Sequence, residues 1–222
     1  MAFRHLFLLL FLICFQHAVA LIPGRYDKLF SLGVNVTKTE YSGDMGSTIF
    51  NFGQKSYMYY WGMGSTFSIN LNPSFDVGIN GNFGSYGYNN FSGGGFFSSN
   101  KLDLSTLVNY KLDNGYILNR ENLFSPILTT GIGFAKYSNN KHEGEFGNIN
   151  PGWDLILPVG AGVQIKFNKT WGLRYQYLYY FTFDDIHEKK VGGGNDIFGQ
   201  HLVSIVYSFG NVLRQNDCKC DY

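Results

Sequence analysis

Apolar and polar residues alternate one by one over much of the chain, most clearly between residues 153 and 183. This period of two is typical of a β-strand, because successive side chains leave opposite faces of the pleated backbone. Two alternating runs, 153–167 and 171–183, are separated by a tight turn at Asn168, Lys169 and Thr170. In both runs one face is aliphatic and aromatic, whereas the other holds mostly Gly, Gln and Thr with a few charges. The stretch predicts a β-hairpin with one apolar face.

The length of these runs favours a membrane-spanning hairpin. Each exceeds the ~9–11 residues that a tilted strand needs to cross a bilayer, and the ~5–6 residues of an ordinary globular strand. Aromatic side chains near the ends of an apolar face are suited to the boundary between lipid and water. We therefore expect a lipid-facing aromatic girdle. Its members are Trp61, Trp153, Trp171, Tyr175, Tyr177, Tyr179, Phe181, Tyr207 and Phe209.

The same alternation predicts six more strands. They cover residues 30–37, 57–71, 75–84, 101–112, 124–137 and 198–209. Connections after the first, third, fifth and seventh strands are long and polar (38–56, 85–100, 138–152 and 184–196), whereas the other three are shorter. In the connection that follows residue 112, the piece 116–118 has no clear assignment. Long and short connections alternate in this way in outer-membrane barrels whose two ends lie in the periplasm. The fold class expected for residues 21–209 is all-β, an eight-stranded antiparallel up-and-down transmembrane β-barrel with four long extracellular loops.

The first 20 residues are predicted to be a signal peptide that is removed on export. A basic start at Arg4 precedes an apolar run at 6–15, and the small residues Ala18 and Ala20 mark the cleavage site. Residues 210–222 are expected to form a short polar periplasmic tail. An exported chain with no apolar stretch long enough for a membrane helix points to the bacterial outer membrane of a Gram-negative cell.

The net charge and the small fraction of charged residues narrow the class of protein further. Without Arg4, 16 of the 17 basic residues remain against 16 acidic ones, which argues against a nucleic-acid binder. Charged residues are 15% of the chain, against roughly 25% in typical soluble domains. Low charge together with 18% aromatic residues supports a barrel that contacts lipid.

Several short motifs resemble a known family. They are YSGD at 41–44, LNPSF at 71–75, FSPIL at 124–128 followed by GIG at 131–133, LPVGAGV at 157–163, and NKTWGLR at 168–174 with FDD at 183–185. Over about residues 28–210 the chain resembles the eight-stranded outer-membrane barrel family, similar to the N-terminal domain of OmpA, in its Bacteroidetes-type branch. The resemblance implies insertion by the barrel-assembly machinery and contact with outer-membrane lipids. It brings no peptidoglycan-binding domain to this chain, because only the short tail follows residue 209.

Four charged residues on the polar faces lie within a few residues of a short turn: Asp76, Lys111, Lys166 and Arg174. We expect them to gather near the periplasmic end of the lumen, and Asp76 and Arg174 to meet across it, because their strands are opposite in a ring of eight. Isolated buried charge is costly, so pairing is expected. The cluster is either a packed, salt-bridged plug, which we favour because eight strands leave little free space, or an electrostatic gate in a narrow pore.

Other candidate chemistry is weak. Some loop residues could bind a divalent cation, but we favour solvated loop charge as their explanation, and we predict neither metal nor cofactor. These residues are His142, Glu143, Glu145, His187 and Glu188. Asp184 and Asp185 with His187 provide acid–base groups for a surface enzyme, yet no nucleophile is fixed beside a base, so no enzyme is predicted. Cys218 and Cys220 are too close together for ordinary disulfide geometry.

The sequence leaves three functional hypotheses. The first is a small outer-membrane barrel, expected to be a monomer, with a structural or surface-interaction role, a packed polar lumen and no nucleic-acid partner. The second is a narrow passive pore for ions. The third is a secreted lipocalin-like barrel that binds a ligand inside, in which the apolar faces would have to point inward.

Overall fold

The computed structural model describes residues 28–42, 60–90, 95–119, 122–144, 152–183 and 197–210. They form eight strands: β1 (Phe30–Ser42), β2 (Tyr60–Asn70), β3 (Phe75–Asn90), β4 (Gly95–Lys111), β5 (Phe124–Gly144), β6 (Gly152–Lys166), β7 (Trp171–Thr182) and β8 (Ile197–Phe209). The predicted signal peptide with Ala18 and Ala20, the tail with its cysteines, and positions 145 and 184–188 lie outside the described residues.

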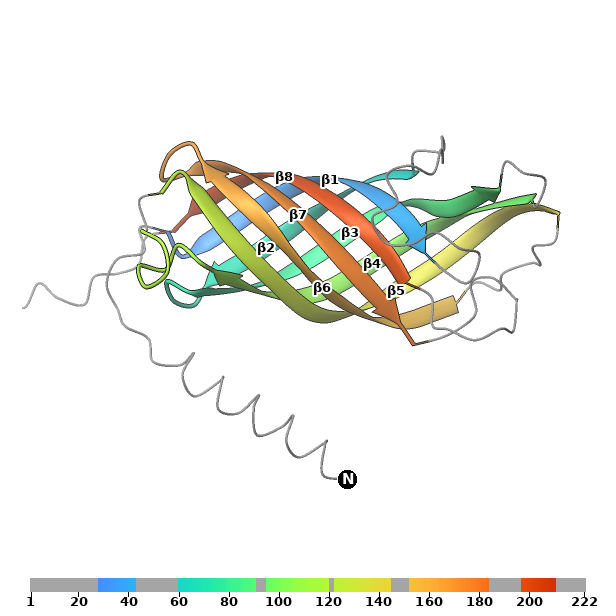
Figure 1. Ribbon diagram of the computed structural model, residues 1–222, viewed down its shortest axis with the longest axis horizontal. Helices are drawn as coiled ribbons and strands as arrows, with labels where there is room; N and C mark the ends of the chain where they lie inside the picture. Colours follow the sequence, from blue (N-terminus) through green and yellow to red (C-terminus); the bar gives the residue numbers. More distant parts are fainter. Residues whose placement is uncertain are drawn as a thin grey trace, which may run out of the picture.

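The strands form one closed barrel in which each pairs antiparallel with its neighbours in sequence (Figure 1). Pairing of β1 with both β2 and β8 closes the ring, because Phe30 faces Ile69 on one side and Phe209 on the other. The described chain enters and leaves at the same end, where the Leu29 amide donates to the Gly210 carbonyl at 2.8 Å. We call this the turn end, because connections 71–74, 112–123 and 167–170 lie there, and the opposite end the loop end. The predicted eight-stranded up-and-down barrel is confirmed.

The period of two places apolar side chains outside the barrel. Along β1, Leu32, Val34 and Val36 are exposed, whereas Ser31 and Asn35 are buried. The outer faces of the other strands are apolar as well, and Val34 is 65% exposed on the outer face of β1. A secreted barrel with an apolar interior and a polar outer wall has the opposite arrangement, so the lipocalin-like hypothesis is wrong. No helix in the described part of the chain is long and apolar enough to cross a membrane.

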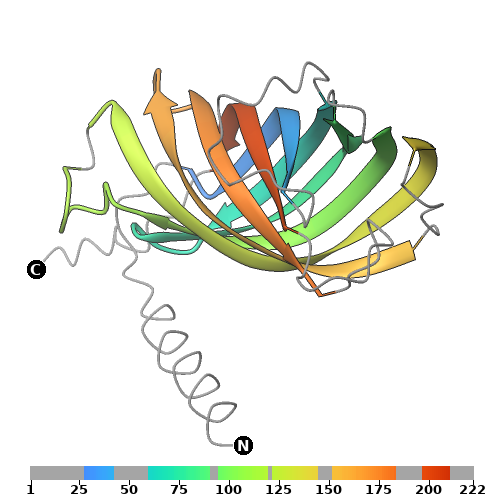
Figure 2. The ribbon, with the colours of Figure 1, turned by 45° about the vertical axis from the view of Figure 1, so that its right-hand side comes forward.

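Four strands, β1, β3, β4 and β5, are at least five residues longer than predicted, which corrects the expectation of four long loops. β3, β4 and β5 have 16, 17 and 21 residues, and they reach beyond the other strands at the loop end (Figures 1 and 2). Most of the segment 85–100 is therefore a paired hairpin, with Asn90 facing Gly95. Residues 38–42 and 138–144 also continue strands. Their Gly, Ser and Asn content indicated loops, but cross-strand hydrogen bonding overrides such weak local preferences.

Each connection at the turn end contains an asparagine that folds back on the backbone. The side-chain oxygen of Asn72 accepts from the amides of Ser74 and Phe75, both at 2.8 Å. Asn168 accepts from Thr170 and Trp171 at the same distance, and Asn114 accepts from two amides of its own turn. Asparagine favours such turns because its short side chain mimics a backbone acceptor. These caps explain why the turns predicted at 72–74 and 168–170 are formed.

Replacing Asn168 by alanine is expected to lower the free energy of unfolding by about 1 kcal/mol, because two backbone amides lose their side-chain acceptor. The loss is modest because the turn is exposed and water can accept hydrogen bonds from these amides in its place. Urea unfolding in detergent micelles, followed by tryptophan fluorescence, measures this change. Asn168→Asp keeps the acceptor and serves as the matched control. A loss as large for aspartate as for alanine contradicts the capping role.

The interior is not uniformly polar, which corrects the prediction of a packed polar lumen. Toward the loop end, nine inward-facing residues with at most 2% exposure form an apolar core: Tyr86, Leu107, Ala135, Tyr137, Ile156, Leu178, Tyr180, Phe198 and Leu202. Polar side chains dominate the turn-end half. The small glycines of the inner faces leave room for these large rings, and a closed ring of eight strands has space for little else. We call the apolar group the lumen core.

Candidate functional site in the barrel lumen

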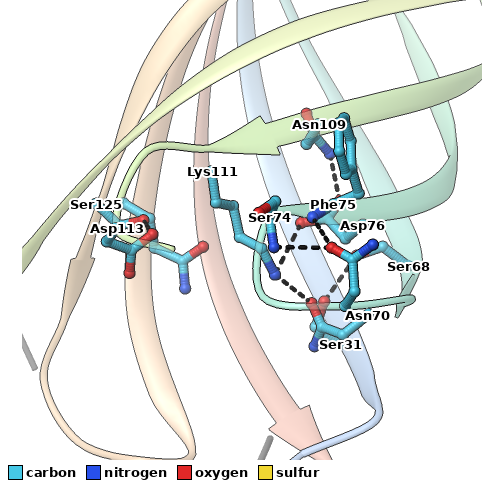
Figure 3. Close-up of polar contacts among 12 residues, drawn as sticks. Ser31, Ser68, Asn70, Ser74, Phe75, Asp76, Asn109, Lys111, Asp113 and Ser125 are labelled. Carbon is cyan, nitrogen blue, oxygen red and sulfur yellow. Dashed lines mark hydrogen bonds and ion pairs between the residues drawn. The ribbon is translucent and has the colours of Figure 1, made fainter. Parts of the chain in front are cut away.

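The structure brings three of the four predicted lumen charges together at the turn end. Asp76 of β3 is fully enclosed, with one carboxylate oxygen 3.9 Å from Lys111 Nζ and 3.8 Å from Arg174 Nη2. Its other oxygen accepts a 2.6 Å hydrogen bond from Asn109, and Lys111 donates to Asn70 at 2.8 Å (Figure 3). Because β3 and β7 are opposite strands, the contact between Asp76 and Arg174 crosses the lumen.

The fourth predicted charge, Lys166, has a different partner. It pairs with Asp113, which lies just after β4, in the connection expected after residue 112. Asp113 also accepts a hydrogen bond from the hydroxyl of Ser125 (Figure 3). The continuing alternation of residues 109, 111 and 113 was the signal that could have placed Asp113 on the inner face. The turn end thus holds two ion-pair groups in place of one.

Hydrogen bonds between side chains of non-adjacent strands cross the middle of the lumen. Gln176 of β7 donates to Asn109 of β4 at 3.1 Å and to Thr129 of β5 at 2.7 Å. On the other side, the Asn35 amide of β1 reaches past β2 to Asn80 of β3 at 2.9 Å. These bonds connect the side chains of strands that are two or three positions apart around the ring.

A buried ion pair lies beyond these networks, beside the lumen core. Lys101 is 1% exposed, and its Nζ lies 3.0 Å from Asp103, which also accepts from Asn82 at 2.9 Å. The ammonium group sits over the rings of Tyr180 and Phe198, at 4.8 and 4.3 Å from their centroids. Such contacts stabilise a cation that has lost its water. Two aromatic rings and one carboxylate therefore surround the Lys101 ammonium group in the interior of the barrel.

The sequence analysis did not single out Lys101, although residue 101 begins the predicted strand 101–112. Lys101 lies two residues before Asp103 on β4, so the period of two places both side chains on the same face of the strand. This spacing was the signal that could have revealed the pair.

A partly open cavity of about 950 Å³ lies at the turn end, below the hydrogen-bonded networks. The charged groups Asp76, Lys111 and Arg174 line it, together with Asp113 and Lys166. Its wall thus combines buried charge with amide and hydroxyl groups. An arrangement like this can hold a polar ligand.

The predicted girdle residues lie on the outer face of the barrel. Trp61, Trp153, Trp171, Tyr175, Phe181 and Tyr207 are exposed, whereas Tyr177, Tyr179 and Phe209 are partly covered by neighbours. Trp171 and Tyr207 contact each other at 4.8 Å at the turn end, and Trp153 lies toward the loop end. Tyr175, Tyr177 and Tyr179 lie one after another on the outer face of β7, so they form a stripe that runs along this strand. A lipid-facing role for the set remains a prediction.

One polar group also lies on the outer face. Glu40 is 3.1 Å from Lys38 Nζ and 3.2 Å from His201 Nε2, and the Tyr175 hydroxyl is 2.8 Å from His201 Nδ1. Both histidine nitrogens are thereby occupied, and the surrounding strands pair along β1 and β8. The group thus joins side chains of β1, β7 and β8 on the outer face of the barrel.

The candidate metal ligands of the loops receive little structural context. His142 and Glu143 belong to β5, whereas positions 145, 187 and 188 are outside the described residues. Among the residues that the structure does describe, no three His, Cys, Asp or Glu side chains lie close enough to hold a metal ion.

A protein-family model described as "Outer membrane protein beta-barrel domain" matches residues 6–209. Among solved structures, Neisserial surface protein A is similar at a TM-score of 0.51 and 14% identity, over 81% of this chain and 97% of that chain. The outer membrane protein OprG from Pseudomonas aeruginosa is similar at 0.52 and 13% identity, over 85% of this chain and 99% of that chain. At such identities the likeness concerns the fold alone. No curated protein sequence matches this chain.

Proposed function

This chain belongs to the outer membrane protein β-barrel domain family, and we propose that within it the protein is a non-enzymatic, non-conducting barrel that serves a structural or surface-interaction role. The observation that carries this proposal is the filled lumen. Tyr180, Phe198 and Lys101 are at most 1% exposed, and hydrogen bonds from Gln176 and Asn35 join non-adjacent strands below them. Ions crossing the barrel would have to displace packed side chains, which interiors resist because they are close-packed.

The loop end supports a role in surface contact. β3, β4 and β5 extend past their neighbours and remain paired to Asn90, Gly95 and Gly144. A paired sheet that continues beyond the barrel rim is a stiffer platform than a loop, because its backbone donors and acceptors are already satisfied. Stiff surfaces lose less conformational entropy when they bind a partner.

The proposal includes the topology and partners expected for this architecture. Export would use the first 20 residues, and the barrel-assembly machinery would insert the chain as a monomer. The turn end, where both ends of the described chain meet, would face the periplasm, and the loop end would face outward. Outer-membrane lipids would contact the exposed apolar side chains of the wall, since such barrels carry an apolar band ~25 Å tall.

Conductance in planar lipid bilayers tests the proposal directly. The natural chain is expected to give no steady channels above background leakage. The double variant Tyr180→Ala with Phe198→Ala removes two stacked rings, 4.9 Å apart, from the lumen core and is expected to raise leakage. Steady single-channel currents from the natural chain would support the pore hypothesis instead.

That second hypothesis, a narrow pore, rests on the turn-end cavity, which already opens part of the lumen. Opening the remainder requires the bonds between Gln176 and Asn109 and the packing of the lumen core to break together. Because those contacts are buried and cooperative, the closed state is favoured.

A further inference from the structure

Among the residues that the structure describes, basic side chains outnumber acidic ones in the lining of the turn-end cavity. This part of the lining contains five basic side chains and two acidic ones. The basic side chains are Lys28, Lys111, Lys166, Lys169 and Arg174. The acidic ones, Asp76 and Asp113, are 1% and 5% exposed and are engaged in the ion-pair groups described above. A concave, partly water-excluded site of one sign raises the local concentration of ions of the opposite sign.

Arg174 provides directional hydrogen-bond donors in the wall of this cavity. Its side chain is 5% exposed, and in the described part of the chain it forms hydrogen bonds with Gln164 alone, from Nε at 3.1 Å and Nη2 at 2.8 Å. Nη1 donates to none of the described residues. A guanidinium has five N–H donors in a planar fork that matches carboxylate and phosphate oxygens. One of its edges is thus left for a ligand in the cavity.

Asp76 does not occupy that edge. Its oxygen is 3.8 Å from Arg174 Nη2 and 3.9 Å from Lys111 Nζ, whereas charge-assisted hydrogen bonds are roughly 2.7–2.9 Å long. The shortest contact of Asp76 is the 2.6 Å hydrogen bond that it accepts from Asn109. The two cations are therefore held near each other by Asp76 without being hydrogen-bonded by it. Two cations fixed side by side around a cavity favour an anion that carries more than one charge.

We propose that the turn-end cavity is a binding site for a small organic anion that bears carboxylate or phosphate groups, held by the Arg174 guanidinium and attracted by the surrounding lysines. The cavity volume of about 950 Å³ falls in the range of small-ligand sites, roughly 300–1,000 Å³. Packed side chains close the lumen beyond it, so the ligand enters and leaves through the turn end. The proposal adds a ligand to a barrel whose proposed function needs none.

Isothermal titration calorimetry on the folded barrel, in an uncharged detergent at low salt, tests the site with citrate and with pyrophosphate. We expect saturable binding of one anion per barrel, weaker at higher ionic strength because salt screens the attraction, and no binding of glycerol. Citrate and pyrophosphate separate carboxylate from phosphate recognition. Arg174→Gln is expected to weaken binding of the preferred anion at least about 10-fold, since it removes the charge-assisted donors.

Lys136→Gln is the matched control, because it removes one positive charge from the outer face near Trp153, far from the cavity. Its affinity should equal that of the natural chain. A difference in gel migration between unheated and boiled samples shows that each variant is folded. Should Arg174→Gln not fold, the Nε–H resonance of Arg174 in NMR spectra of the natural chain must shift saturably with added anion. The absence of saturable binding, equal binding by Arg174→Gln, or an unmoved Arg174 resonance overturns the proposal and leaves the conductance result untouched.

Discussion

Replacing Asp103 by asparagine is expected to lower the free energy of unfolding by about 3–5 kcal/mol, which is the usual cost of removing one partner from a buried ion pair. Asp103 and Lys101 are 0% and 1% exposed, and Lys101 Nζ has Asp103 as its carboxylate partner at 3.0 Å. Asparagine keeps the size of the side chain but leaves the lysine charge unbalanced among Tyr180 and Phe198. Urea unfolding in lipid vesicles, followed by tryptophan fluorescence, measures the loss.

The double variant Lys101→Met with Asp103→Asn separates charge from packing. Methionine preserves the long stem of lysine between the two rings, and the variant has no buried charge at this position. Most of the lost stability should therefore return, because replacing a whole ion pair by neutral groups is often close to neutral. The double-mutant cycle gives the coupling energy of the pair. A single variant Asp103→Asn that stays within about 1 kcal/mol of the natural chain shows that the pair carries no net stabilising charge interaction.

Replacing Ile205 by arginine is expected to destabilise the membrane-inserted barrel by about 2–4 kcal/mol, the cost of a cation at the middle of the apolar band. Ile205 is 59% exposed on the outer face of β8, four residues from the end of the strand at Phe209, and it faces Val34 and Leu173 on the neighbouring strands. Folding into vesicles of defined lipid, followed by gel shift and urea titration, measures the effect.

Tyr116→Arg is the control for this prediction. Tyr116 is 81% exposed in the connection between β4 and β5, at the turn end and outside the barrel wall. The same change in charge there should alter stability by no more than about 0.5 kcal/mol, as is usual at an exposed surface. In a water-soluble barrel both substitutions would be harmless, since Ile205 would then face water. An Ile205→Arg barrel as stable as the natural chain contradicts lipid contact at this position.

Strand number and facing could be predicted because they depend on a local rule. The alternation of Leu32, Val34 and Val36 with Ser31 and Asn35 indicates which side of β1 faces out. A register shift of one residue would turn every side chain of the strand to the other face. Strand ends were less predictable. The segment 85–100 has the composition of a loop, and it is a hairpin because β4 pairs with both β3 and β5 there.

The candidate site was predictable in its location but not in its pairing. The distance of Asp76 and Arg174 from a short turn placed both at the turn end, and the count of eight strands made them opposite. No sequence rule states that Lys166 reaches Asp113 or that Arg174 directs two of its donors to Gln164. Such choices depend on strand tilt and side-chain length, which act over the whole ring.

By itself, the sequence determined that this protein is a closed wall of eight strands with an apolar outside, because the two-residue period and the connection lengths are local properties of the chain. Only the tertiary structure decided which side chains fill the interior of the barrel. The aromatic rings around Lys101 and the charged cavity beside Arg174 are formed by residues from opposite strands. Their contacts exist once the ring closes, because closure alone brings residues such as Gln176 and Asn109, 67 positions apart, within hydrogen-bonding distance.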